Sequence, residues 1–234
     1  MSDFWKVFPK GNVFLVVIHV QTESQVLRNV KIAHEEGADG VFLISHGAVS
    51  APDLLQFYRS VRRLYPSWWI GMNFLDCTAL DALLIIPEDA SGLWVDDAGI
   101  DEYVKDPRKS ARLLWELRKQ KVSWQGLYFG GVAFKYRQQV EDVAYVAELA
   151  VPYMDVITTS GDATGQPPTE EKIWAMREAI GDHPLAIASG IMPENIGRYL
   201  GVADGFLVAT GISKSFTELD PARVRELAQI IHPS

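Results

Sequence analysis

Four side chains at the ends of short apolar runs could perform acid–base or covalent chemistry: His19, Asp96, Asp97 and Lys135. Histidine titrates near neutral pH, and a carboxylate can act as a general base. Burial would lower the pKa of Lys135, which could then act as a base, form a Schiff base or contact an anion. Alternatively, its side chain extends out of its loop into water. Adjacent strand residues point to opposite faces, so at most one of the two aspartates can face such a site.

A second group of residues is suited to binding an anion. In AIASGIMPENIGRYL (186–200), an apolar run stops at Ser189-Gly190 and a helix is expected from Pro193. Glycine lets an anion approach the backbone closely, and free N–H groups at a helix start favour negative charge. The alternative is that these glycines only turn the chain tightly. The candidates for phosphate binding are Gly161, Thr164, Gly165, Ser189, Gly190, Thr210, Gly211 and Ser213.

The elements that would position these residues repeat along the chain. Each of eight β-rich runs is followed by a helical pattern; the runs cover 13–20, 40–46, 68–75, 92–97, 126–134, 155–160, 184–190 and 205–212. This alternation predicts parallel strands joined by helical crossovers. We expect an α/β fold with a single (β/α)8 TIM barrel spanning residues 1–234. An open doubly wound sheet is the alternative, but the first strand lacks the usual G-x-G-x-x-G loop.

A barrel brings the C-terminal ends of its strands to one face, where the functional residues of this fold lie. Loops after strands 7 and 8, with a short extra helix, often hold phosphate there. The segment 212–219 is long enough for such a helix. Three further polar residues are candidates for substrate contacts: His46, Asn73 and Asn195. An aspartate could also hold Mg²⁺ beside His19 and His46; no metal ligand is assigned, and the cofactor stays open.

The C-terminal third resembles the BtpA/SgcQ family of barrel proteins. The resemblance is strongest over 155–231 and rests on SGDATG (160–165), SG (189–190) with EN (194–195), ADG (203–205), Thr210 and DPARV (220–224). It implies a (β/α)8 barrel but no settled reaction, because some members are linked to photosystem I biogenesis and others to sugar utilisation.

The first half departs from that family's pattern. Ser45-His46 stands where the family has Glu-Asn, Asn73 is kept, and Lys135-Tyr136 replaces Lys-His. The chain therefore retains the anion-binding part of the pattern and differs in the part expected to carry chemistry.

Composition excludes several classes of protein. The net charge of −8 argues against a nucleic-acid-binding surface, and the single cysteine, Cys77, excludes an intramolecular disulfide. The basic stretch 105–121 is interpreted as the solvated face of a helix whose inner stripe is Leu113, Leu114 and Leu117. The first residues lack signal-peptide features and no apolar run could span a membrane, so we expect a cytoplasmic protein. Pairing of outer faces into a homo-oligomer is possible.

Two functions fit these observations. The first is an enzyme that acts on a small phosphorylated metabolite, a sugar or nucleotide phosphate, by acid–base or Schiff-base chemistry, as a lyase, isomerase or transferase. The second is a non-catalytic barrel that binds a ligand as an assembly or regulatory factor.

Overall fold

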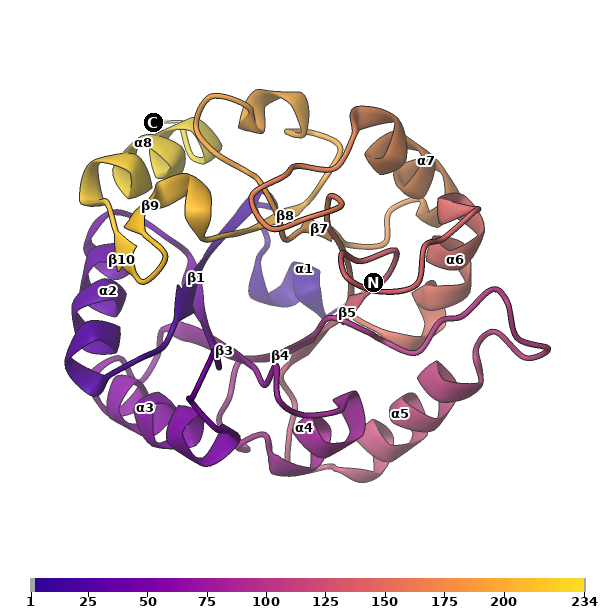
Figure 1. The fold of residues 1–234 in the computed structure, drawn as a ribbon, viewed down its shortest axis with the longest axis horizontal. Helices are drawn as coiled ribbons and strands as arrows, with labels where there is room; N and C mark the ends of the chain where they lie inside the picture. The colour runs from indigo at the N-terminus through magenta and orange to yellow at the C-terminus, as the bar shows by residue number, and fades with distance from the viewer. Residues whose placement is uncertain (1–2, 234) are drawn as a thin grey trace.

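The computed structural model describes residues 3–233 and contains a closed barrel of eight parallel strands (Figure 1). Each strand pairs with the next along the chain, and β1 pairs with β8 to close the ring. The strands are β1 (Val13–His19), β2 (Gly40–Ile44), β3 (Trp69–Asn73), β4 (Gly92–Val95), β5 (Leu127–Gly131), β6 (Val156–Thr159), β7 (Leu185–Ile187) and β8 (Gly205–Val208). The (β/α)8 prediction is confirmed, and all eight strands lie within the predicted runs.

Helices surround the barrel, and side chains fix where several of them begin. The α-helices are α1 (Phe4–Val7), α2 (Glu23–Glu35), α3 (Ala51–Leu64), α4 (Ala79–Ile85), α5 (Lys109–Gln120), α6 (Val143–Ala150), α7 (Glu170–Ile180) and α8 (Pro221–Ile231). Thr22, Thr78, Thr169 and Asp220 each accept a hydrogen bond from a backbone N–H of the first turn. Residues 3–233 also contain three short 3-10 helices: η1 (Val151–Tyr153), η2 (Ile196–Arg198) and η3 (Thr210–Ile212).

The prediction of a helix that begins at Pro193 is wrong. The chain after β7 forms only the 3-10 helix η2, so this strand lacks the α-helix that its sequence suggested. The side chain of Asn195 explains the difference. Its amide donates to the carbonyl of Gly190 and its oxygen accepts from the N–H of Met192, at 2.8 and 2.9 Å. Such local bonds compete with helical ones and close a tight loop.

The prediction of an extra helix at 212–219 is also wrong. This segment is a two-stranded antiparallel hairpin of β9 (Ser213–Ser215) and β10 (Glu218–Leu219). The backbone of the hairpin hydrogen-bonds to side chains of α2, which a helix at this place would not do. Contacts with a distant element therefore determine the conformation of this segment. Residues 3–233 contain no helix long and apolar enough to cross a bilayer.

Aromatic side chains fill the inside of the barrel. Phe42 makes edge-on contacts with Trp69, Trp94 and Phe129 at 5.0–5.6 Å between ring centroids. A Cβ at Gly71 would lie 2.4 Å from the Phe42 ring, so glycine makes room for these rings. Helix α1 lies within the ring of strands in Figure 1, and its fully buried Phe4 joins the same core.

The helix α5 packs less closely than its pattern indicates. Ala111 is buried, whereas Leu113 of the expected inner stripe is 57% exposed. The prediction that Leu113 packs on the barrel is therefore wrong, and the leucine face of α5 borders a groove.

Candidate functional site

A cavity of about 570 Å³ lies at the C-terminal ends of the strands, and residues at or just after the end of each of the eight strands line it. It brings together nine of the residues singled out in the sequence: His19, His46, Asp96, Lys135, Thr164, Gly165, Ser189, Gly190 and Thr210. The candidates that do not line it are Asn73, Asp97, Gly161, Asn195, Gly211 and Ser213.

Lys135 stands on the loop after β5. Its Nζ donates to the carbonyl oxygen of Ala188 at 3.0 Å, and its backbone N–H donates to Oγ of Ser160 at 2.7 Å. Burial lowers the pKa of the ammonium group, and the carboxyl of Asp96 opposes that effect. The side chain therefore reaches across the barrel to the β7 loop with a larger neutral fraction than an exposed lysine.

The backbone around Lys135 is strained. Ala133 and Tyr136 have φ angles of 48° and 60°, a region that residues with side chains rarely occupy. Lys172 on α7 holds this loop, because its Nζ donates to the carbonyl oxygens of Ala133 at 2.6 Å and Ser160 at 2.7 Å. Burial lowers the pKa of Lys172 to about 8. Strain of this kind persists where the surroundings enforce it and is frequent at functional sites.

His19 ends β1 beside the cavity. Its pKa falls to about 4, first because the ring is buried and then because His46 and Lys135 lie nearby. The phenyl ring of Phe216 stacks on the imidazole at 4.1 Å between centroids, and His46 lies 4.6 Å from the same phenyl ring. At neutral pH His19 is therefore an uncharged imidazole, which can accept a proton or a hydrogen bond.

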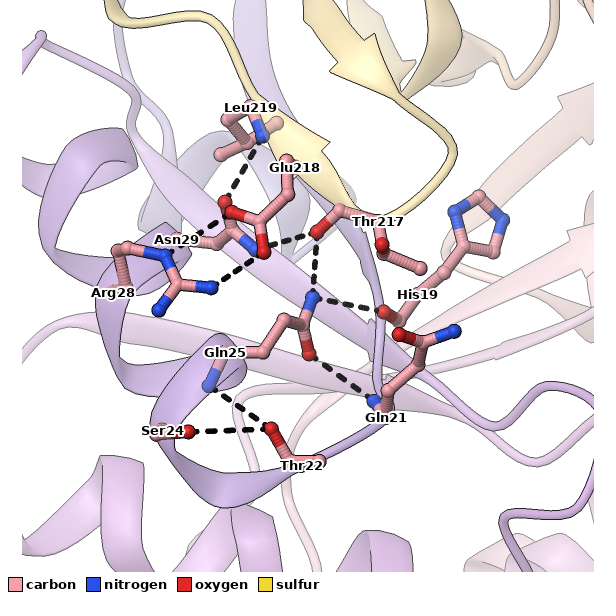
Figure 2. Close-up of polar contacts among 10 residues, drawn as sticks. All are labelled: His19, Gln21, Thr22, Ser24, Gln25, Arg28, Asn29, Thr217, Glu218 and Leu219. Carbon is pink, nitrogen blue, oxygen red and sulfur yellow. Dashed lines mark hydrogen bonds and ion pairs between the residues drawn. The ribbon is translucent and has the colours of Figure 1, made fainter.

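The hairpin β9–β10 carries Phe216 to this position, and α2 anchors the hairpin (Figure 2). Nε2 of Gln25 donates to the carbonyl oxygens of Thr217 at 2.7 Å and of His19 at 3.1 Å. Asn29 donates to the same Thr217 oxygen at 2.8 Å and accepts from the N–H of Leu219 at 3.0 Å. The two amide side chains thereby tie β1, α2 and the hairpin together.

The two aspartates after β4 have different surroundings. Asp96 lines the cavity and burial raises its pKa, although Nδ2 of Asn73 donates to its carboxylate at 3.1 Å. Asn73 is itself buried, and its hydrogen bond orients the carboxylate of Asp96. Asp97 lies outside the cavity, and its Oδ1 accepts from the N–H of Gly99 at 2.9 Å in the following turn.

The loops after β6, β7 and β8 present free backbone N–H groups. Within residues 3–233, the N–H groups of Gly165, Gly190 and Thr210 have no hydrogen-bond partner. Gly165 and Gly190 have φ angles of +79° and +66°. A Cβ at Gly190 would lie 2.1 Å from the backbone nitrogen of Pro167, so glycine is required where these loops meet. Unpaired N–H groups gathered at one rim are donors for an anion.

The remaining candidates shape these loops. A Cβ at Gly161 would lie 2.3 Å from the carbonyl oxygen of Gln166, and one at Gly211 would lie 2.0 Å from that of Ile191. The hydroxyl of Ser189 donates within the β6 loop, to the carbonyl of Ala163 or Gln166 at 2.9 or 2.8 Å. Ser213 donates to the carbonyl of Ala209 at 2.8 Å.

Two polar residues that line the cavity, Tyr136 and Arg137, were not among the candidates from the sequence. The hydroxyl of Tyr136 hydrogen-bonds to the side-chain hydroxyl of Thr164 at 3.2 Å and accepts from the backbone N–H of the same residue at 3.0 Å, and these two contacts, the side-chain one first, lower the pKa of Tyr136. Arg137 is exposed at the rim, and its charge acts on the carboxyl of Asp96. Both follow Lys135 directly, and the basic Lys-Tyr-Arg run after β5 was the available signal. Among residues 3–233 no group of three or more His, Cys, Asp or Glu side chains could hold a metal ion.

Comparison with known proteins supports the interpretation of the second half. The model of the BtpA family matches residues 132–233. Over these residues the chain is BtpA-like. The match contains the loops after β5, β6, β7 and β8, so the BtpA resemblance inferred from residues 155–231 is confirmed. No curated protein matches the chain.

Solved structures share the fold at low sequence identity. One is (S)-3-O-geranylgeranylglyceryl phosphate synthase from Thermoplasma acidophilum in complex with sn-glycerol-1-phosphate, with a TM-score of 0.69, 13% identity and 100% of each chain covered. Another is phosphoribosyl anthranilate isomerase from Thermus thermophilus, with a TM-score of 0.57, 14% identity, and 92% of this chain and 96% of that chain covered. At these identities the likeness establishes the fold.

Proposed function

We propose that the chain is an enzyme that binds a small phosphorylated metabolite in the cavity at the C-terminal ends of its strands. One observation carries the proposal: Lys135 and His19 line the same cavity as Gly165, Gly190 and Thr210, the residues of the β6, β7 and β8 loops whose N–H groups are free. The phosphate would accept hydrogen bonds from the N–H groups of Gly165, Gly190 and Thr210.

The fold supports this position for the phosphate, because barrels often hold phosphate at the loops after strands 7 and 8. The names of two structures with this fold include phosphorylated compounds, a glycerol phosphate and a phosphoribosyl group. Within residues 3–233 no extra α-helix stands between β8 and α8; the short 3-10 helix η3 begins there at Thr210, so the donors are N–H groups of the loops and of the first residue of η3.

Lys135 would supply the chemistry in its neutral form. Its Nζ can remove a proton next to a carbonyl group or attack the carbonyl carbon itself. In the second case a C–N bond forms, the carbonyl oxygen leaves as water, and an iminium ion remains. His19 is uncharged at neutral pH and can accept a hydrogen bond or a proton, and burial raises the pKa of Asp96 above its ordinary value, so these two side chains are the candidates for proton transfer beside Lys135.

A thermal-shift screen tests the binding part of this proposal. The probes are inorganic phosphate, triose, pentose and hexose phosphates and nucleotides, each with and without Mg²⁺. A ligand that binds the folded state raises the melting temperature by mass action. We expect a rise for phosphate esters and none for the matching unphosphorylated sugars. The absence of any rise at millimolar phosphate esters would contradict the site.

Borohydride reduction tests the chemical part. Borohydride added with a phosphorylated aldehyde or ketone that binds would convert an iminium ion into a stable secondary amine, which mass spectrometry locates. We expect the label on Lys135 and none in the variant Lys135→Met. If the ligand binds without a label, proton-transfer chemistry remains, and Lys135→Met must then abolish turnover. Turnover unchanged in that variant would remove Lys135 from the mechanism.

A further inference from the structure

A second cavity of about 680 Å³ opens next to the first one, between the loops after β3 and β4 and the helix α5. Leu75, Asp96 and Arg137 line both cavities. The two spaces are therefore neighbours with a common border, and a ligand larger than a sugar phosphate could extend from one into the other. The helices α4 and α5, which bound this groove, lie side by side in Figure 1.

Leucine side chains form the outer wall of the groove. Leu113, Leu114 and Leu117 come from one face of α5, and Leu80 comes from the first turn of α4. Leu113 is 57% exposed and Leu80 is 41% exposed. Water-exposed apolar surface gains free energy when it is covered, and a cluster of such residues beside a polar cavity is typical of a binding groove.

The charges at the border define the kind of occupant. Arg137 stands at the border, and Lys135 stands on the cavity side together with the free N–H groups of the loops after β6, β7 and β8. The leucines of α4 and α5 lie beyond the border, where the groove is also lined by the carboxylates of Asp76 and Asp97, which disfavour an anion there. An anionic head fits the first space and an apolar chain fits the second. A protein partner that covered the leucines would not need the groove to be continuous with the cavity at Arg137, whereas a ligand with an anionic head and an apolar tail would.

We propose that the groove binds the apolar tail of an amphiphilic phosphate ester, whose phosphate occupies the cavity. This inference rests on the proposed function, because it assigns the phosphate to the same donors. The substrate class is then a phosphate monoester with a hydrocarbon or similarly apolar substituent, rather than a sugar phosphate alone.

Calorimetric titration of the full chain with inorganic phosphate and with monoalkyl phosphates from ethyl to octyl tests the proposal. Each methylene that enters the groove should tighten binding about fourfold, which corresponds to about 0.8 kcal/mol. The heat-capacity change of binding should become more negative along the series.

Two leucine variants provide the matched comparison. Leu113→Gln should weaken the dependence on chain length and leave the affinity for inorganic phosphate unchanged. Leu84→Gln changes a leucine of α4 that is 62% exposed and does not line the groove, so its dependence on chain length should equal that of the unaltered protein.

The outcomes separate this inference from the function on which it rests. Phosphate binding without any dependence on chain length would overturn the tail site and leave the phosphate site intact. If the affinity depended on alkyl chain length equally in Leu113→Gln and Leu84→Gln, the tail site would also be overturned. If neither phosphate nor any alkyl phosphate binds, both proposals are overturned. A dimer that Leu113→Gln dissociates in sedimentation, without chain-length dependence, would assign the groove to a second copy instead.

Discussion

The protonation of His19 gives the sharpest prediction from the geometry. Its pKa is about 4 in the folded chain, compared with 6.5 for an exposed histidine. At about 1.4 kcal/mol per pKa unit, this difference corresponds to at most about 3 kcal/mol of folding free energy. The unfolded chain binds this proton at a higher pH than the folded chain does. His19 therefore removes stability as the pH falls from 6.5 to 4 and has no effect above 6.5.

The assay is an NMR titration of the five histidines, with His19 assigned from the variant His19→Gln. We expect the His19 signal to report a neutral ring down to about pH 4 and to be missing in the variant, which distinguishes it from His183, whose pKa burial also lowers. Urea unfolding should show that the unaltered protein loses stability between pH 6.5 and 4 by up to about 3 kcal/mol more than His19→Gln does.

The variant Phe216→Ala tests the cause. Removal of the stacked ring admits water to the imidazole, so the pKa of His19 should rise towards 6.5. Phe216 is 43% exposed, so its loss should leave the fold intact. A pKa of 6.5 or above for His19 in the unaltered protein would refute the reasoning, and a pKa unmoved by Phe216→Ala would refute the role given to the hairpin.

Three further predictions concern packing and polar contacts. Gly71→Ala places a methyl group against an aromatic ring of the barrel and should cost about 1–3 kcal/mol in urea unfolding; an unchanged midpoint would contradict the packing described. Asp204→Ala leaves Arg177 half-buried without its carboxylate partner and should cost about 3 kcal/mol by the same assay, whereas a cost below about 0.5 kcal/mol would show that the pair is exposed to solvent. Asn73→Ala removes the amide that donates to Asp96, so the pKa of Asp96 should rise further in a carboxyl NMR titration; a fall would contradict the contact.

The strands and the cavity face were predictable because both depend on local, repeated patterns. Eight apolar runs at regular spacing fix the barrel, and the barrel fixes which strand ends meet. His19, Asp96 and Lys135 could therefore be assigned to one face before their contacts were known. The alternation rule predicted that at most one of the two aspartates faces the site, without saying which, and in the structure Asp96 lines the cavity whereas Asp97 does not.

Features decided by distant residues were not predictable. The hairpin at 213–219 bonds to Gln25 and Asn29, about 190 positions earlier in the chain, and no local pattern encodes that partnership. Lys172 lies on a helix and looks like a surface lysine in the sequence, yet it holds two loop carbonyls. The groove beside α5 arises because Leu113 is left uncovered, which helical periodicity cannot reveal.

The phosphate site is the central claim, and Gly165 offers the most direct test of it. This residue lines the cavity at a φ of +79°, and the nearest atom to an added Cβ is Oγ1 of Thr210 at 3.7 Å. Asparagine and aspartate have nearly the same size and both tolerate this conformation better than other side chains. The variants Gly165→Asn and Gly165→Asp therefore differ mainly in charge.

The measurement is the dissociation constant of inorganic phosphate for the unaltered chain and these two variants, by calorimetry at low ionic strength. A carboxylate within about 4 Å of a bound phosphate repels it by well over 1 kcal/mol. We predict that Gly165→Asn binds phosphate within a few-fold of the unaltered chain and that Gly165→Asp binds it at least about tenfold more weakly. Equal affinity in Gly165→Asn and Gly165→Asp, or no binding by the unaltered chain, would contradict the account.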